Sequence, residues 1–273
     1  MINKDQFHLF HSVKRKIYYT FIRIIRVITS VFYPKKSPQF LFILSPPYCG
    51  STMLNQLLSS SKNVSCNNNL GTREGQLLPG VHHFMFQKDR WDSKVNYPWE
   101  EVKKVWMRYW DSSKPIFLDK SIPNIMRVNE IENVFSPIKY MCMVRNPYAQ
   151  VEGIMRRNKQ DSKSAAEFAI MCLHYQRKNK ARHNALFFSY EELCEKGEVI
   201  LKKIVDFVPE LNDIDANIEF TSHNVKSEGK MKMINLNEEK ISKISDNDLE
   251  IINSVFVKEE ELLNLFNYKI LKR

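Results

Sequence analysis

The feature that most constrains the fold is an apolar run that leads directly into a turn and then into a helical pattern. Residues 39–44 read QFLFIL, residues 45–50 read SPPYCG, and apolar side chains then recur at helical spacing over Met53–Ser60. A buried strand, a tight turn and a helix in this order gather unpaired backbone N–H groups and the positive end of the helix dipole at one point. The segment therefore predicts an anion-binding turn within an α/β fold.

The same alternation of strand and helix continues along the chain. Further short apolar runs predict strands at Asn63–Cys66, Pro115–Leu118, Ile138–Val144 and Ala185–Phe188. Helical patterns occur at Trp99–Trp110, Ile125–Val134, Tyr148–Arg157, Ser164–Lys180, Glu198–Phe207 and Asp246–Phe266. Buried strands that alternate with helices are typical of parallel sheets covered on both faces. We expect an α/β protein with a P-loop-like three-layer fold, in which helices flank a central, mainly parallel sheet.

The first 36 residues differ in character from the rest. Residues 17–33 are largely apolar, but Arg23 and Arg26 interrupt them. Charges at the centre and a length below about 20 residues both disfavour a membrane span. We interpret residues 1–36 as a basic amphipathic appendage, and residues 37–273 as one domain. The appendage either packs on that domain or makes a peripheral membrane contact through residues 14–36.

Charge and cysteine content narrow the choice of partner and compartment. The formal net charge is +10, which favours an anionic partner such as a nucleotide, an acidic polymer or a membrane surface. Lysine and arginine are spread along the whole chain, so we expect no nucleic-acid partner. The five cysteines are widely spaced and form no C-x-x-C pair, which indicates neither a metal site nor a disulfide framework. A reducing compartment is the simpler assumption, so we expect a cytoplasmic protein, peripheral to the membrane if the appendage binds lipid.

The turn after the first strand differs from the phosphate loop of nucleotide kinases. Ser45 replaces the first glycine of that loop, and Ser51 stands where a kinase has its lysine. Gly50 permits close approach of the backbone, while Ser51 and Thr52 offer hydroxyl groups and an N-cap. The string ending in Asp119 imitates the strand with the metal-binding aspartate of P-loop enzymes, so a P-loop nucleotide kinase stays an alternative.

A second anion-binding pattern follows the strand predicted at Ile138–Val144. Arg145 stands at the carboxyl end of this strand, where its guanidinium group can donate two N–H bonds to a phosphate. Pro147 suits the first turn of the helix that follows. Ligands of open parallel sheets bind at the carboxyl ends of strands, so the two patterns support each other.

Together these patterns resemble the sulfotransferases that use 3′-phosphoadenosine 5′-phosphosulfate (PAPS), over roughly residues 39–270. Residues 47–52 (PYCGST) are similar to the family's 5′-phosphosulfate loop, with Tyr48 at the usual basic position. Residues 145–153 are similar to its 3′-phosphate motif, with Gly153 at the usual serine position. The resemblance implies that the donor nucleotide contacts Tyr48, Cys49, Gly50, Ser51, Thr52, Arg145 and Gly153.

Three further segments extend the resemblance. Residues 119–124 (DKSIPN) are similar to the family's E-K-[ST]-P-x-N segment, and residues 189–193 (SYEEL) to its Y-E-D-L element. Residues 222–232 lie where the family places a basic loop over the 3′-phosphate. These similarities imply that Lys120 supplies positive charge to the sulfate or leaving oxygen, that Tyr190 packs near the adenine or in the core, and that Lys226 contacts the 3′-phosphate.

The resemblance also implies a base beside the acceptor hydroxyl. Our candidate is Glu74, because tyrosylprotein sulfotransferases, which this bacterial-type sequence resembles here, have a glutamate in a Gly/Glu/Arg-rich loop at the corresponding place. His82 and His83 compete with it, because cytosolic members use a histidine. Arg73 is a second candidate for the sulfate, or for an anionic acceptor.

We therefore predict a transferase that moves a sulfuryl group from its co-substrate PAPS to an acceptor hydroxyl by in-line transfer. A glycan, a lipid-linked molecule or a peptide suits the acceptor role, and a membrane-facing appendage would favour the lipid-linked class. Besides the kinase, a non-catalytic anion- or glycan-binding protein of the same fold stays an alternative, which Tyr48 and Gly153 favour.

Overall fold

A central five-stranded sheet organises the molecule in the computed structural model, which describes residues 13–33, 37–221, 230–231 and 233–272. The strand order is β2-β3-β1-β4-β5, and every neighbouring pair is parallel. The strands are β1 Gln39–Leu44, β2 Val64–Cys66, β3 Ile116–Asp119, β4 Ile138–Val144 and β5 Ala185–Ser189. The sheet confirms the predicted α/β, P-loop-like fold and all five predicted strands to within two residues.

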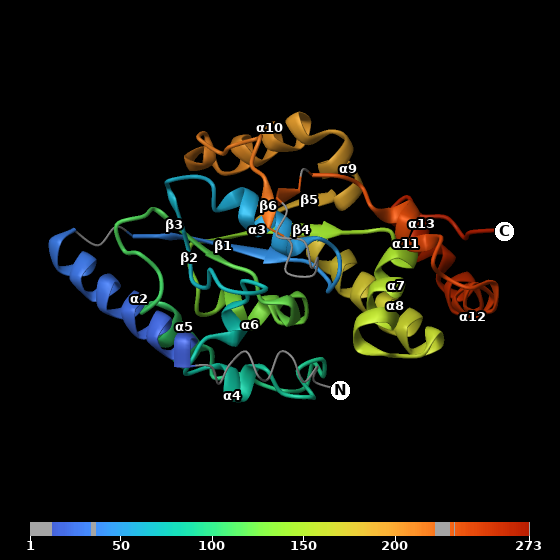
Figure 1. The fold of residues 1–273 in the computed structure, drawn as a ribbon, viewed down its shortest axis with the longest axis horizontal. Coiled ribbons are helices and arrows are strands. Elements are labelled where there is room, and N and C mark those ends of the chain that lie inside the picture. Colours follow the sequence, from blue (N-terminus) through green and yellow to red (C-terminus); the bar gives the residue numbers. More distant parts are fainter. Residues whose placement is uncertain (1–12, 34–36, 222–229, 232, 273) are drawn as a thin grey trace.

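Two apolar cores cover the two faces of this sheet. Phe40 and Phe42 of β1 pack in a cluster with Trp106, whereas the alternating Leu41 and Ile43 belong to a second cluster. Successive side chains of a strand point to opposite faces, so β1 contributes to both cores. In Figure 1, α9 and α10 lie above the sheet, while α5 and α6 lie below it. This is the predicted three-layer arrangement.

The helices follow the sequence pattern with some interruptions. The main ones are α3 Ser51–Leu58, α5 Trp99–Trp106, α6 Val128–Glu132, α7 Pro147–Asn158, α8 Ser162–Lys180, α9 Tyr190–Glu195, α10 Gly197–Phe207, α11 Asn237–Ile241, α12 Asp246–Phe256 and α13 Glu260–Leu265. The prediction of one helix over Asp246–Phe266 is wrong, because a 3₁₀ turn at Val257–Glu259 separates α12 from α13. Glu259 has a φ of −124°, which is outside the helical range. The short strands β6 Phe220–Thr221 and β7 Lys230–Met231 were not predicted.

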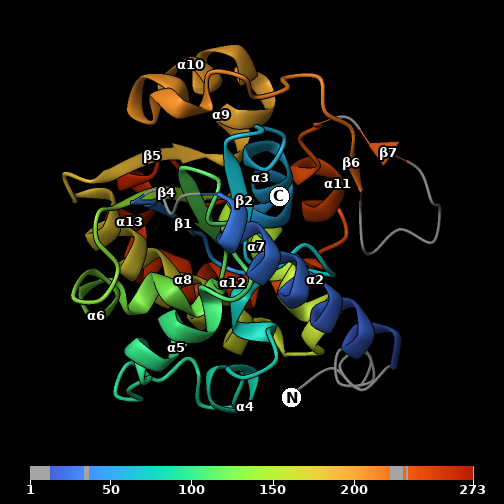
Figure 2. The same ribbon diagram turned by 90° about the vertical axis from the view of Figure 1, so that its left-hand side faces the viewer.

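The N-terminal helix α2, Val13–Phe32, packs along one side of the domain (Figures 1 and 2). Tyr19 is buried, and its hydroxyl donates a hydrogen bond of 3.1 Å to Asn68 Oδ1. Arg26 Nη1 lies 2.7 Å from Asp111 Oδ2. One of the two expected placements of this helix, packing on the domain, is therefore observed. Within the described ranges, no helix has both the length and the hydropathy of a membrane span.

Candidate active site

The turn between β1 and α3 has the geometry of an anion-binding loop. Gly50 has a φ of 89° and is the N-cap of α3, so the prediction that Ser51 and Thr52 supply an N-cap is wrong. A Cβ atom at Gly50 would lie 2.7 Å from Tyr190 Cδ2. Both the left-handed backbone and the contact with the Tyr190 ring therefore require glycine here. The N–H groups of the first turn of α3 point towards the carboxyl edge of the sheet.

Lys120 connects the start of α3 with the loop that follows β2 at this edge. Its ammonium group donates to Thr52 Oγ1 at 3.0 Å and to the carbonyl oxygen of Thr72 at 2.7 Å. It also lies 3.3 Å from Glu74 Oε1, and the Lys120 side chain is only 2% exposed. Glu74 Oε2 accepts a second hydrogen bond, from Gln76 Nε2. The structure thus brings Thr52, Lys120 and Glu74 together around one buried ion pair.

Asp119 fixes the loops that carry this ion pair. Its carboxylate is fully buried and accepts hydrogen bonds from two amide side chains, Asn67 Nδ2 at 2.8 Å and Asn124 Nδ2 at 3.0 Å. The backbone N–H groups of Gly75 and Ser121 donate to it at 3.1 and 2.9 Å. Burial raises the pKa of Asp119 to about 6, against the opposing effect of these hydrogen bonds. Asp119 therefore positions its neighbours Lys120 and Glu74.

Arg145, at the end of β4, is the second cation of the site. Its guanidinium carbon lies 4.0 Å from the centre of the Tyr190 ring, and Nη1 donates to the carbonyl oxygen of Tyr48 at 3.2 Å. Nε donates to Asn237 Oδ1 at 2.6 Å, whereas Nη2 is buried without a hydrogen-bond partner among the described residues. A buried guanidinium nitrogen without a hydrogen-bond partner destabilises the folded protein unless a ligand accepts a hydrogen bond from it. This atom fits an anionic group of a nucleotide.

Tyr48 and Gly153, the two departures from the family pattern, are in contact with each other. A Cβ atom at Gly153 would lie 2.8 Å from Tyr48 Cβ and 3.0 Å from Tyr48 Cγ. Tyr48 itself has a φ of 64°, and its hydroxyl lies 2.6 Å from Asn158 Oδ1. The space that a serine at residue 153 would need is therefore taken by Tyr48. The two departures form a single local feature.

Several cations that sequence reasoning missed lie around Tyr48 and Arg145. Burial raises the pKa of Tyr48, while the positive charges of Arg157, Arg156 and Arg90 lower it. Lys240 of α11 is in the same region, with its Nζ 3.9 Å from Glu152 Oε2. Its pKa is lowered to about 8, first by burial and next by the charge of Arg145. These residues lie outside the matched motif positions, so no signal in the single sequence distinguished them from ordinary surface cations.

The remaining predicted residues either have partners of their own or lie outside the described ranges. Arg73 Nη1 donates to Asn55 Oδ1 at 3.0 Å. His82, on the short helix α4 His82–Met85, stacks on Phe86, and the His83 side chain is exposed. Lys226 lies outside the residues that the structure describes. Tyr190 is 4% exposed, donates to the carbonyl oxygen of Ile234 at 2.7 Å, and packs its ring against Arg145.

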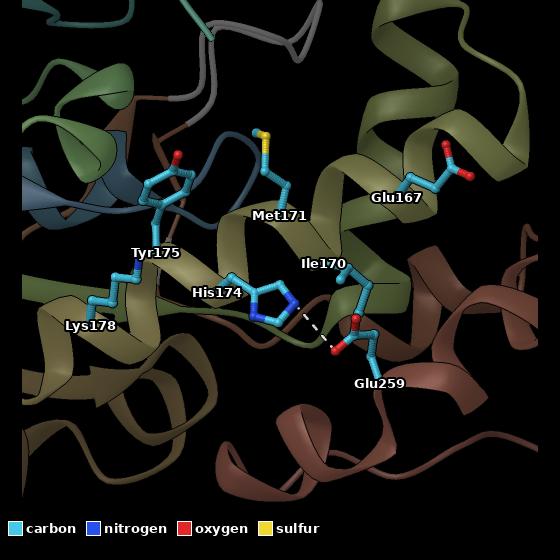
Figure 3. Close-up of a pocket in the computed structure, with 7 residues that line it drawn as sticks. All are labelled: Glu167, Ile170, Met171, His174, Tyr175, Lys178 and Glu259. Atoms are coloured by element: carbon cyan, nitrogen blue, oxygen red, sulfur yellow. Dashed lines mark ion pairs between the residues drawn. The ribbon is translucent and has the colours of Figure 1, made fainter. Parts of the chain in front are cut away.

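A surface pocket of about 410 Å³ lies elsewhere on the molecule. Figure 3 shows its lining residues on α8 and on the turn before α13, where His174 Nε2 lies 3.2 Å from Glu259 Oε2. None of the predicted donor or catalytic residues lines it. The predicted site residues instead gather at the carboxyl ends of β1, β3 and β4, the edge where open parallel sheets bind ligands.

The fold defines a class of protein, the α/β proteins with a P-loop-like fold around an all-parallel central sheet. A family model described as the sulfotransferase family matches residues 38–211. Because this match covers well over half of the chain, the chain belongs to the sulfotransferase family, whose members are sulfuryl-transferring enzymes. No curated protein is significantly similar to it in sequence.

Solved structures agree with the fold of this family. The sulfotransferase domain from the curacin biosynthetic pathway is similar with a TM-score of 0.50 at 15% identity, covering 86% of this chain and all of that domain. A sulfotransferase from Alicyclobacillus acidocaldarius gives a TM-score of 0.50 at 13% identity, covering 86% of this chain and 97% of its own. At sequence identities this low, the structural similarity is evidence for a shared fold only.

Family membership decides against the kinase alternative, and the local geometry agrees. In P-loop kinases the hydroxyl after the lysine holds a magnesium ion. Here the ammonium group of Lys120 contacts the hydroxyl of Thr52 at 3.0 Å. Asp119 is the expected counterpart of the metal-binding aspartate. Its carboxylate instead accepts hydrogen bonds from Asn67, Ser121 and Asn124.

Proposed function

We propose that this protein transfers the sulfuryl group of PAPS to an acceptor hydroxyl, with Glu74 as base and Lys120 as the cation of the leaving side. The observation that carries the proposal is the buried contact of Lys120 with both Thr52 and Glu74. Thr52 belongs to the loop that resembles the 5′-phosphosulfate loop, and Glu74 belongs to the loop expected beside the acceptor. One ammonium group thus lies between the donor loop and the base.

The reaction follows from this arrangement. The acceptor oxygen attacks sulfur in line, its proton moves to a Glu74 carboxylate oxygen, and the bond between sulfur and the bridging phosphate oxygen breaks. The leaving group is 3′-phosphoadenosine 5′-phosphate (PAP), which gains the negative charge. Before the reaction, the ammonium group of Lys120 balances the charge of Glu74 at 3.3 Å. Once Glu74 is protonated, the charge of Lys120 is available to the leaving oxygen, together with the N–H groups at the start of α3.

The donor contacts expected at residues 48–52 and at Arg145 are part of this proposal. The buried Nη2 of Arg145 has no hydrogen-bond partner among the described residues, and a phosphate oxygen would complete it. Gly153 supplies no side-chain contact, so we assign the missing contact of the serine to Lys240, whose Nζ lies 3.9 Å from Oε2 of Glu152, the residue before Gly153. Lys226 and the packing of Tyr190 near the adenine stay predictions.

PAP should stabilise the purified protein against thermal unfolding. At 100 times its dissociation constant, the ligand is expected to add about 2.7 kcal/mol to the free energy of unfolding. Arg145→Ala should remove this shift. Arg182→Ala should keep it, because Arg182 pairs with Glu132 and belongs to neither donor motif. A shift with ATP and magnesium instead of PAP, or an undiminished shift in Arg145→Ala, would contradict the proposed donor site.

The affinity for PAP should decrease as the pH rises through about 8. Burial and the charge of Arg145 lower the pKa of Lys240 to about 8, so its positive charge is present below this pH and lost above it. A charged hydrogen bond to a phosphate contributes about tenfold or more in affinity. Calorimetric titration between pH 7 and 9 should show this decrease.

Lys240→Met should flatten the pH profile of PAP binding. This variant therefore tests whether Lys240, rather than another titrating group, causes the decrease in affinity. Lys243→Met is the matched control, because Lys243 is exposed and pairs with Glu239. The Lys243→Met protein should keep the slope of the unchanged protein. An equal slope in the Lys240→Met protein would show that another group titrates.

The acceptor and location are the less specific part of the proposal. A glycan, a lipid-linked molecule and a peptide all carry a suitable hydroxyl, and the cytoplasmic location expected from the cysteines stays a prediction. The non-catalytic alternative predicts that PAP binds while no acceptor becomes sulfated. Incubating the protein with labelled PAPS and one acceptor of each class distinguishes the two functions.

A further inference from the structure

The outward face of α2 carries a row of large apolar side chains. Their spacing of three or four residues places them on one face of the helix. Each is more than half exposed: Val13 69%, Ile17 63%, Phe21 59%, Ile24 54%, Ile28 51% and Val31 74%. We call these six residues the outer stripe. A contiguous row of exposed apolar residues on a helix indicates a binding surface rather than ordinary surface variation.

The opposite face of α2 fixes the direction of this stripe. Tyr19 is buried against the domain, with its ring centre 5.9 Å from that of Tyr109. Tyr18 and Ile22 pack against the same core, and Arg26 pairs with Asp111 at 2.7 Å. Rotating the helix to bury the stripe would break all of these contacts. The outer stripe is therefore presented to whatever lies outside the domain.

The charges beside the stripe identify the partner. Lys14, Lys16 and Arg23 are exposed on α2, and the helix contains no aspartate or glutamate. A second copy of α2 lying on the first would bring these cations together without compensating carboxylates. An anionic lipid surface offers both an apolar layer for the stripe and negative headgroups for the cations.

We propose that α2 lies in the plane of an anionic lipid bilayer surface, with its outer stripe inserted between the headgroups. The domain side of the same helix contacts the loop of the proposed base. Tyr19 donates to Asn68 at 3.1 Å, and Asn68 Nδ2 donates to the carbonyl oxygen of Glu74 at 2.8 Å. The lipid surface then lies about one helix diameter, roughly 10 Å, from this loop. The docking itself does not depend on the transfer chemistry.

Vesicle sedimentation tests the docking without donor or acceptor. The full chain should bind vesicles of phosphatidylcholine with roughly one third phosphatidylglycerol, and bind pure phosphatidylcholine vesicles at least about tenfold more weakly. The double variant Ile24→Glu and Ile28→Glu should lose about tenfold or more of the binding to the anionic vesicles, because both side chains lie in the stripe.

The matched control is the double variant Val199→Glu and Val257→Glu. These two valines are 54% and 56% exposed on other helical segments, so the variant has the same charge change outside α2. It should bind anionic vesicles as the unchanged protein does. PAP-induced thermal stabilisation, which should be the same in both double variants, shows that the domain is folded and tests the donor site separately.

Three results would overturn the docking. The first is no binding of the full chain to anionic vesicles, and the second is equal loss of binding in the control variant. The third is a dimer in sedimentation equilibrium without lipid that Ile24→Glu and Ile28→Glu convert to a monomer. That result would assign the stripe to a second copy of the chain.

Discussion

Replacing Lys120 with methionine is expected to lower the rate of sulfuryl transfer by about three orders of magnitude. A positioned charge that stabilises the transition state contributes about 10²–10³ in rate when a single donor is removed. The ammonium group of Lys120 contacts the donor loop at Thr52 and the base at Glu74, so its loss affects both sides of the transfer. The measurement is single-turnover transfer from labelled PAPS to the acceptor that the unchanged protein sulfates fastest. PAP, which has no sulfuryl group, should still bind.

The stability of the Lys120→Met protein needs its own control. Lys120 and Glu74 are 2% and 8% exposed, and removing one partner of a buried ion pair costs about 3–5 kcal/mol. The double variant Lys120→Met and Glu74→Gln removes both charges, so it should unfold at a higher denaturant concentration than Lys120→Met alone. It should still be inactive. A Lys120→Met protein with unchanged turnover would contradict the assigned role, whatever its stability.

Sequence reasoning located the sheet well because its signals are local. Successive side chains of β1 belong to the two cores in turn, so the strand is buried on both faces. A strand of this kind is a continuous apolar run in the sequence and can be recognised from its own residues. The interruption between α12 and α13 had no comparable signal. The residues around Glu259 include no proline or glycine, so the helical pattern continues through a position whose backbone is not helical.

The cluster around Lys120 could be predicted only in part. The position of Lys120 after β3 placed it at the carboxyl edge of the sheet, where it is found. Its contact with Glu74 depends on the loop that follows β2. Asp119 fixes the path of this loop by accepting hydrogen bonds from Asn67 and Gly75, which are far from it in the chain. Lys240 was missed for the same reason, because α11 reaches Arg145 through a tertiary contact, the hydrogen bond from Arg145 to Asn237, that no local pattern encodes.

The contact between Tyr48 and Gly153 could not be predicted from the sequence either. There the two residues appear as independent departures from the family motifs. Each removes a group that the family pattern contains, a basic side chain in one case and a hydroxyl in the other. In the structure, the absent Cβ of Gly153 is what leaves room for Tyr48. We therefore expect substitutions at residues 48 and 153 to have non-additive effects on stability, which two residues without a contact would not show.

Restoring the serine of the family motif by Gly153→Ser is expected to destabilise the protein by about 1–3 kcal/mol. The new Cβ atom would lie 2.8 Å from Tyr48 Cβ, in a fully packed part of α7. The carbonyl oxygen of Tyr48 accepts from Arg145 Nη1 at 3.2 Å, so moving Tyr48 should also weaken PAP binding. Urea unfolding and calorimetric titration measure the two effects.

A double-mutant cycle tests whether Tyr48 is the cause. Tyr48→Gly removes both the Cβ atom and the side chain, and it suits the φ of 64° at this residue, so Gly153→Ser should cost about 1–2 kcal/mol less in its presence. Gly197→Ser is the matched control, because a Cβ atom there would have its nearest neighbour, Met233 Cε, at 3.8 Å. It should change the stability by no more than about 0.5 kcal/mol. Additive effects, or equal costs at residues 153 and 197, would mean that the contact does not explain why this member of the family lacks the serine.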